Sequence, residues 1–169
     1  MNNLDPAIIT NITFGYADSE DRLWARLIMT DQSETTIWLT RSLCQAVCNG
    51  LGQVLEKNTV LSGDTPASED AIQKYIKTEF FEAKTTTWSP TPEPPKADSP
   101  SPTDLGLGRL CHTIQITPGD TWQLRFLLPQ ARPMVMGLQR TQVHKILAAL
   151  LLQGQRAQWN WQLNHDWMK

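Results

Sequence analysis

A chain of 169 residues with a formal net charge of −2 and only 19% charged residues has no strong attraction for polyphosphate, so we expect no nucleic-acid partner. It contains no run of about 20 apolar residues, and we therefore expect no membrane-spanning helix. The apolar fraction of 40% is enough for one hydrophobic core. The first residues lack the basic and apolar regions of a signal peptide, and the three cysteines are an odd and sparse set. These features predict a cytoplasmic protein with reduced thiols.

The first half of the chain alternates short β-like runs with polar turns and then becomes helical. Apolar residues at every second position predict strands, and apolar residues at steps of three and four predict helices. Thr40 is placed to cap the first helix with its hydroxyl. Gly50 and Gly52 within this helix indicate either close packing against another backbone or an early helix end. The predicted strands are residues 8–14, 22–30 and 35–39, and the predicted helices are residues 40–57 and 66–84.

Residues 85–108 differ in composition from the rest of the chain. Six prolines between Pro90 and Pro102 interrupt any helix or central strand. We predict a flexible, extended linker, with a proline-rich ligand for an aromatic groove as the alternative. The linker separates a first part, residues 1–84, from a second part, residues 109–169, and we expect the two parts to pack into one compact domain.

The second part repeats the element order of the first. A shift of 99 residues places Asp21–Leu55 over Asp120–Gly154 without a gap and with apolar positions in register. Few aligned residues are identical, so the alternative to a duplication is a chance likeness of two β-meanders that each precede a helix. The predicted strands are residues 110–117, 121–128 and 134–138, followed by a helix from Arg140 through at least Leu152. This order predicts an α+β fold, with an antiparallel β-sandwich or barrel-like core from two β-β-β-α halves and an extra helix after the first half.

No residue can be assigned to catalysis, to a cofactor or to a metal. Cys44 and Cys48 lie one helical turn apart and could supply two metal ligands with Cys111 as a third, but cysteine also packs well in a core, which is the preferred interpretation. The sequence contains no nucleophile elbow and no phosphate-binding glycine loop in its required context. We therefore expect a protein that is not an enzyme and has no cofactor.

The C-terminal residues are the most suggestive surface. From Val143 to Met168, residues at alternating steps of three and four follow the seam of a coiled coil, which predicts a long helix that pairs with a second copy. The alternatives are a helix that ends near Gly154 before a short strand, and a helix folded onto its own sheet. Arg41 and Arg140 open the two matched helices, where each could bind a partner's carboxylate or phosphate or cover the sheet edge. The candidate interaction residues are Trp159, Trp161, Leu163, Trp167, Arg41 and Arg140.

In its element order, the chain resembles the head domain of the scaffold proteins of DNA double-strand-break end joining, a superfamily that includes the centriole assembly scaffold. The most similar stretch runs from Trp122 to Leu128 and continues in Gly137 to Arg140. The resemblance implies a small β-sandwich that holds a helix–turn–helix between its strands, and a C-terminal helix that pairs into a parallel homodimer. The proline-rich insertion and the short last helix depart from the pattern, so the ligase-binding stalk is not carried over.

We therefore expect an interaction or scaffold module that self-associates as a homodimer through its C-terminal region. The sequence does not identify another protein partner. The alternative is a small-molecule-binding or regulatory domain with a pocket between the two halves.

Overall fold

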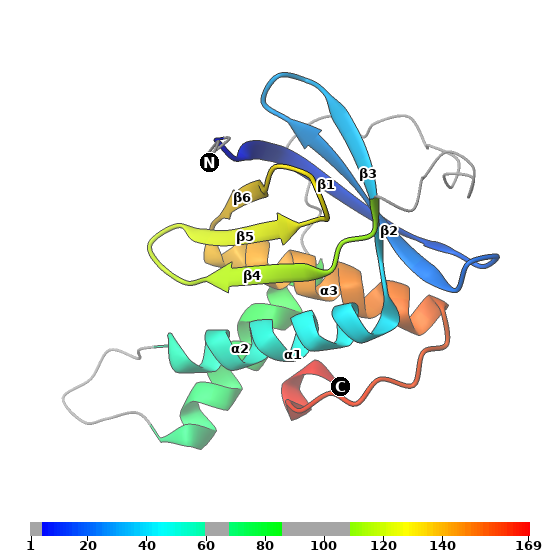
Figure 1. The fold of residues 1–169 in the computed structure, drawn as a ribbon. Coiled ribbons are helices and arrows are strands. Elements are labelled where there is room, and N and C mark those ends of the chain that lie inside the picture. The colour runs from blue at the N-terminus through cyan, green and yellow to red at the C-terminus, as the bar shows by residue number, and fades with distance from the viewer. Residues whose placement is uncertain (1–4, 60–67, 86–108) are drawn as a thin grey trace.

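Three strands, two helices, three further strands and a third long helix follow one another along the chain, in the predicted order (Figure 1). The computed structural model describes residues 5–59, 68–85 and 109–169. The predicted linker thus lies almost wholly outside the described residues. The strands are β1 (Ala7–Ala17), β2 (Arg22–Met29), β3 (Glu34–Leu39), β4 (Thr113–Thr117), β5 (Trp122–Leu127) and β6 (Met134–Leu138), and the helices are α1 (Arg41–Lys57), α2 (Glu69–Thr85), α3 (Arg140–Arg156) and the short 3-10 helix η2 (Asp166–Met168).

The strands form one mixed sheet in the order β3-β2-β1-β6-β5-β4. Each set of three consecutive strands pairs antiparallel, and the two sets are joined by a short parallel pairing of Ala7 with Met134 and of Ile8 with Val135. The α+β class is confirmed. The prediction of a wholly antiparallel sheet is wrong, because β1, the first strand of one set, pairs in parallel with β6, the last strand of the other. Among the described residues, the edge strand β3 is joined to the segment before β4 by an isolated bridge between Trp38 and Leu110, so the sheet is not closed and the predicted sandwich or barrel is not shown.

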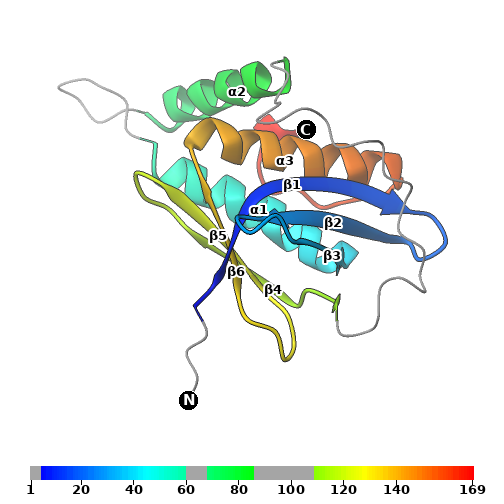
Figure 2. The same ribbon diagram turned by 90° about the horizontal axis from the view of Figure 1, so that it is seen from above.

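The helices pack across the two sets of strands. Helix α1, which follows the first set, packs on β4, and α3, which follows the second set, packs on β1 (Figures 1 and 2). Helix α2 packs mainly on α3. One hydrophobic core therefore takes its side chains from both halves, and its largest fully buried members include Leu23, Leu27, Ile37, Leu51, Leu124, Phe126, Ile146 and Leu147.

Buried positions recur at the shift of 99 residues. In the strands, Leu23, Ala25 and Leu27 correspond to Trp122, Leu124 and Phe126, and all six are buried. The same holds for the helices α1 and α3, at the pairs Val47 and Ile146, Cys48 and Leu147, and Leu51 and Leu150. The predicted register of apolar positions is thus confirmed, whereas the duplication itself stays a prediction.

Local hydrogen bonds set the ends of the elements. The hydroxyl of Thr40 accepts from the amide of Leu43 at 3.2 Å, which confirms the predicted cap of α1. Helix α2 begins at Glu69 and not at Pro66, because the hydroxyl of Ser68 accepts from the amide of Ala71 and so takes the capping position. Strand β4 begins at Thr113 and not at residue 110, because the amide of Cys111 turns away to the carbonyl of Trp38.

The last long helix is shorter than the heptad-like pattern predicts. The amide of Trp159 donates to the carbonyl of Gly154, and the amide of Gln158 donates to the carbonyl of Gln155, both at 3.0 Å. With Gln158 at a φ of 54°, this is a Schellman motif, which ends α3 at Arg156. The continuous C-terminal helix is therefore wrong. The alternative of a helix ending near Gly154 is correct for the helix end, but the short strand expected over Trp159–Leu163 is wrong, because these residues form no strand. Among the described residues, no helix is long and apolar enough to cross a membrane.

Candidate functional site

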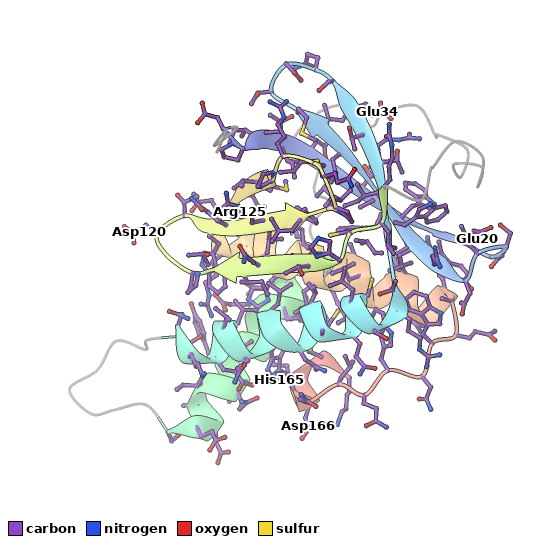
Figure 3. The ribbon with its side chains drawn as sticks, in the orientation of Figure 1. Glu20, Glu34, Asp120, Arg125, His165 and Asp166 are labelled. Carbon is purple, nitrogen blue, oxygen red and sulfur yellow. The ribbon has the colours of Figure 1, made fainter. Side chains whose placement is uncertain are left out.

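The C-terminal tail, residues 157–169, runs back along α1 on the side of that helix away from β4 and β5 (Figures 1 and 3). It contains four of the six predicted interaction residues. Trp159 and Trp167 are buried, at 8% and 4% exposure, and Trp161 and Leu163 are half-buried. The structure thus packs these side chains into the chain's own hydrophobic core: the two buried indoles belong to the core, and Trp161 and Leu163 pack against it.

Side chains of α1 hold the main chain of the tail. Arg41 Nη2 donates to the carbonyl of residue 160 at 3.3 Å, and Gln45 Oε1 accepts from the amide of residue 162 at 3.1 Å. Asn49 makes two bonds: its Nδ2 donates to the carbonyl of residue 162, and its Oδ1 accepts from the amide of residue 164, both at 2.9 Å. Positions 41, 45 and 49 share one face of the helix, so α1 binds an extended segment much as a neighbouring strand would.

Two glycines make room for the tail. A Cβ atom on Gly154 of α3 would lie 2.7 Å from the ring of Trp161, and a Cβ atom on Gly52 of α1 would overlap the side chains of His165 and Met168. Close packing is present at Gly52, but its neighbours are side chains of the tail and not the other backbone that was predicted for the glycines of the first helix. Helix α1 continues past this position to Lys57, so an early helix end is wrong.

Two carboxylates anchor the ends of the tail. Asp21 Oδ1 accepts from Trp159 Nε1 at 2.7 Å and from the hydroxyl of Tyr16 at 2.8 Å, and these bonds lower the pKa of Asp21. Glu56 Oε1 accepts from His165 Nδ1 at 2.7 Å and from Trp167 Nε1 at 3.0 Å. Burial alone would raise the pKa of Glu56, but these donors and Gln73 outweigh it, so that the pKa is lowered.

Arg41 and Arg140 have matching positions on two antiparallel helices. Arg41 opens α1 and donates to the chain that follows α3, and Arg140 opens α3 and contacts the carbonyl of Asn58, the C-cap of α1, at 3.5 Å. Arg140 thus lies at the C-terminal end of α1, where the helix dipole favours positive charge. Arg41 contacts the chain four residues beyond the end of α3.

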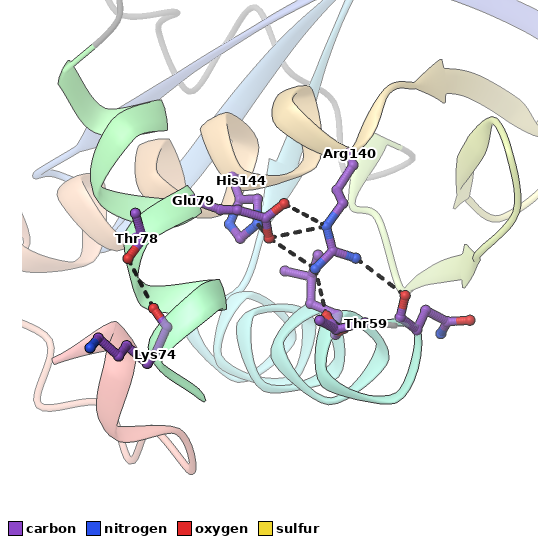
Figure 4. Close-up of polar contacts among 8 residues, drawn as sticks. Thr59, Lys74, Thr78, Glu79, Arg140 and His144 are labelled. Atoms are coloured by element: carbon purple, nitrogen blue, oxygen red, sulfur yellow. Dashed lines mark hydrogen bonds and ion pairs between the residues drawn. The ribbon is translucent and has the colours of Figure 1, made fainter. Parts of the chain in front are cut away.

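Arg140 also belongs to a polar network that joins all three helices (Figure 4). Its Nε lies 2.9 Å from Glu79 Oε1, and its Nη2 donates to Glu79 Oε2 at 2.9 Å and to the hydroxyl of Thr59 at 2.6 Å. His144, which is fully buried, places its Nε2 3.1 Å from Glu79 Oε2. Burial would raise the pKa of Glu79, but the hydrogen bonds from His144 and Arg140 and their charges outweigh it and hold the pKa at about 2. This network attaches α2 to the rest of the molecule.

The three cysteines are buried and unpaired. Burial raises the pKa of Cys44 to about 12 and also raises those of Cys48 and Cys111. Among the described residues, which include all three cysteines, no group of three or more His, Cys, Asp or Glu side chains could hold a metal ion. The alternative metal site formed by these cysteines is therefore not present.

A small apolar cavity lies between the two halves, where the alternative prediction expects a ligand pocket. Its volume is about 10 Å³, which is room for about one water molecule and far below the several hundred Å³ of a typical ligand site. The lining residues come from both sets of strands and from α1 and α3: Phe14, Leu39, Cys44, Val47, Ile114, Leu124, Phe126, Ile146 and Leu150.

Sequence reasoning missed the residues that hold the tail, although Gln45 and Asn49 follow Arg41 at steps of four on one helix face. Such polar spacing is typical of any solvated helix face, so it carried no signal by itself.

Comparison with known proteins gave no match: no family model, no curated protein and no solved structure matches this chain. The resemblance to the end-joining and centriole scaffold heads therefore stays a prediction.

Proposed function

We propose that this protein is a non-enzymatic interaction module that self-associates by exchanging its C-terminal tail between two copies. The observation that supports the proposal is the way α1 holds the tail, through bonds from Arg41, Gln45 and Asn49 to main-chain atoms. Bonds of this kind do not depend on whether the tail belongs to the same chain. A second copy presents the same surface, so two tails can exchange reciprocally.

The tail also has the composition of an interface segment. Large aromatic side chains dominate the energetics of protein interfaces, and the tail carries Trp159, Trp161 and Trp167 within nine residues. Trp159 and Trp167 fill core positions and each donates its indole N–H to a carboxylate. An exchanged tail would keep both of these hydrogen bonds, because their acceptors, Asp21 and Glu56, lie outside the tail itself.

The exchange needs a hinge where the tail leaves α3. Gln158 is the natural position, since it is held in the left-handed region at a φ of 54°. This conformation costs a non-glycine residue about 1 kcal/mol, so a change of direction there releases some of the strain.

The buried, unpaired thiols fit a reducing compartment and support the proposed cytoplasmic location.

Cross-linking of two single-cysteine variants tests the exchange directly. Gln45→Cys and Gln162→Cys place one new thiol on α1 and one on the tail, at positions that are in contact. We expect that the two variants, mixed and treated with a short bis-maleimide, give a covalent heterodimer on a denaturing gel. The native cysteines are buried with raised pKa values and should not react.

A double variant that carries Gln45→Cys and Gln162→Cys in one chain, together with light scattering, completes the test. Light scattering over a range of concentrations should give a dimer for the unmodified chain. Each single variant treated alone is the matched control and should stay monomeric on the gel. If the mixed variants give no heterodimer, the double variant cross-links only within one chain and light scattering gives a monomer, the proposed self-association is wrong.

A further inference from the structure

The end of the C-terminal tail lies between the three long helices. The indole of Trp167 makes an edge contact with the ring of Phe80 of α2, at 5.5 Å between the ring centres, and another with the ring of His144 of α3, at 6.2 Å. Met168 lies over Gly52 of α1, where a Cβ atom would overlap its side chain. Trp167 and Met168 are each only 4% exposed. Helix α2 therefore helps to bury the end of the tail.

One carboxylate joins α2 to the end of the tail. Glu56 Oε1 of α1 lies 2.7 Å from Nδ1 of His165 and 3.0 Å from Nε1 of Trp167, and it also accepts from Gln73 Nε2 of α2 at 2.7 Å. The same oxygen thus meets donors from the tail and from α2 at once. When α2 moves away, Glu56 loses one of these donors and Trp167 loses the ring of Phe80. The position of α2 and the position of the tail end are therefore energetically coupled.

Helix α2 itself is weakly anchored by apolar packing. It lies on the outer side of α3, away from β1 (Figure 2). Three of its 17 residues are buried, Ile76, Phe80 and Ala83, whereas α3, of the same length, buries seven. Segments with few buried apolar side chains open at a lower free energy than the core of a protein. We therefore expect α2 to separate from the rest of the chain before the sheet, α1 and α3 unfold.

The polar attachment of α2 to α3 rests on one residue. The carboxylate of Glu79 pairs with Arg140 and contacts His144, both on α3 (Figure 4). The other ring nitrogen of His144, Nδ1, is buried and has no hydrogen-bond partner among the described residues. The cost of this unpaired atom belongs to the closed arrangement, since water reaches it once α2 separates. These features are typical of a latch that opens and not of a permanent joint.

We infer that α2 is a clamp over the end of the tail, and that α2 has to separate from α3 before Trp167 and Met168 leave their positions. The pair of Glu79 and Arg140 is the latch of this clamp. The inference rests on the proposed function in one respect: where two copies exchange their tails, the opening of α2 controls the rate of that exchange. A change that weakens the latch thus speeds the exchange without altering any hydrogen bond between the tail and α1.

Hydrogen exchange of the unmodified chain, followed by ¹⁵N NMR at low urea concentrations, tests the clamp without a stability variant. The indole N–H of Trp167, which donates to Glu56, and the backbone amide of Phe80 in α2 should open with the same free energy and the same dependence on urea. Trp167→Phe assigns the indole signal. If the indole exchanges faster than the amide of Phe80, the end of the tail leaves while α2 stays in place, and the inference is wrong.

Two variants separate the opening of α2 from global unfolding. Glu79→Gln weakens the latch, and Leu27→Ala, at a fully buried position of β2, lowers the stability of the sheet. We expect hydrogen exchange of the Trp167 indole to become at least tenfold faster in Glu79→Gln and less than threefold faster in Leu27→Ala. If the exchange rate instead follows the free energy of unfolding in both variants alike, the tail end leaves only when the whole chain unfolds, and the inference is wrong.

Cross-linking connects the clamp to exchange between copies. The mixed Gln45→Cys and Gln162→Cys variants should give the heterodimer at least tenfold faster when both also carry Glu79→Gln, and less than threefold faster when both carry Leu27→Ala. An unchanged rate in the Glu79→Gln background would overturn the control of exchange by α2. A heterodimer that forms in no background would contradict the proposed function alone, because the hydrogen exchange of Trp167 tests the clamp within a single chain.

Discussion

At the scale of single residues, three carboxylates organise the polar contacts between distant parts of the chain. Asp21 and Glu56 hold the tail, and Glu79 holds α2 against α3. Each accepts hydrogen bonds from at least two side chains, and each has a lowered pKa. A carboxylate that is better stabilised when ionised makes the folded state more stable at neutral pH than in acid.

Glu79 should therefore control the acid stability of the molecule. Its pKa is about 2 in the folded chain against an ordinary value of 4.5, so the unfolded state takes up a proton first as the pH falls. The stabilisation is complete above about pH 5 and is lost between pH 4.5 and pH 2, and it amounts to about 3 kcal/mol. We expect Glu79→Gln to lower the free energy of unfolding at pH 7 by a similar amount and to flatten its decline toward pH 3.

Urea unfolding of Glu79→Gln at a series of pH values measures both effects. Glu69→Gln, at an exposed position of the same helix, is the matched control and should keep the pH dependence of the unmodified chain. A Glu79→Gln variant with the same decline between pH 5 and pH 3 as the unmodified chain would show that the network in Figure 4 does not act in this way.

Sequence reasoning found one half of this network. It selected Arg140 because Arg41 occupies the matched position at the shift of 99 residues. The sequence did not indicate Glu79, because the ion pair of Arg140 with Glu79 depends on how α2 packs against α3. The spacing of residues within either helix gives no information about that packing. The two interpretations of these arginines were a partner's carboxylate or phosphate and a cover over the sheet edge. In the structure, Arg41 donates to the main chain of the tail and Arg140 pairs with Glu79.

At the scale of elements, the periodic patterns predicted all six strands and three long helices, because apolar alternation follows directly from which face is buried. The errors lie at the ends, where single hydrogen bonds decide. The end of α3 is the clearest case. Glutamine at position 158 gives no sign of a left-handed residue, since glycine is the usual choice there, so the heptad-like spacing appeared to continue.

Two helix glycines that look alike in sequence should respond differently to alanine. Alanine gains about 1 kcal/mol over glycine inside a helix. At Gly50, the added methyl would meet only the end of the flexible Ile116 side chain at 3.3 Å, so we expect a neutral or stabilising effect of up to about 1 kcal/mol. At Gly154, it would lie 2.7 Å from the Trp161 ring, and we expect a loss of about 1–3 kcal/mol.

Urea unfolding curves of the two variants provide the comparison. If the Trp161 contact is the cause, Gly154→Ala should cost little in a chain that already carries Trp161→Ala, and a double-mutant cycle should show this coupling. Equal stability of Gly50→Ala and Gly154→Ala would mean that the tail does not pack on α3 as described.

At the scale of the whole molecule, the two halves are built into each other. Strand β1 pairs with β6, α1 packs on β4, and α3 packs on β1. The sequence could not predict this arrangement, because strand order depends on pairings between segments more than 100 residues apart, and the β1–β6 pairing involves only two residue pairs. Burial is matched in the two halves at the shift of 99 residues, and the duplication itself stays a prediction.

The crossed packing predicts that neither half is stable alone. The fragment of residues 109–169 loses β1 and α1, and the fragment of residues 1–85 loses β6, α3 and the tail, so each exposes a large part of the shared core. We expect the intact chain to unfold in urea in one transition that coincides by far-ultraviolet circular dichroism and tryptophan fluorescence. Each isolated fragment should be unfolded, and the two mixed at equal concentration should recover the spectrum of the intact chain, because the contacts between them do not need the connecting segment. A cooperative transition in either fragment alone would show instead that the halves are separate folding units joined by a weak interface.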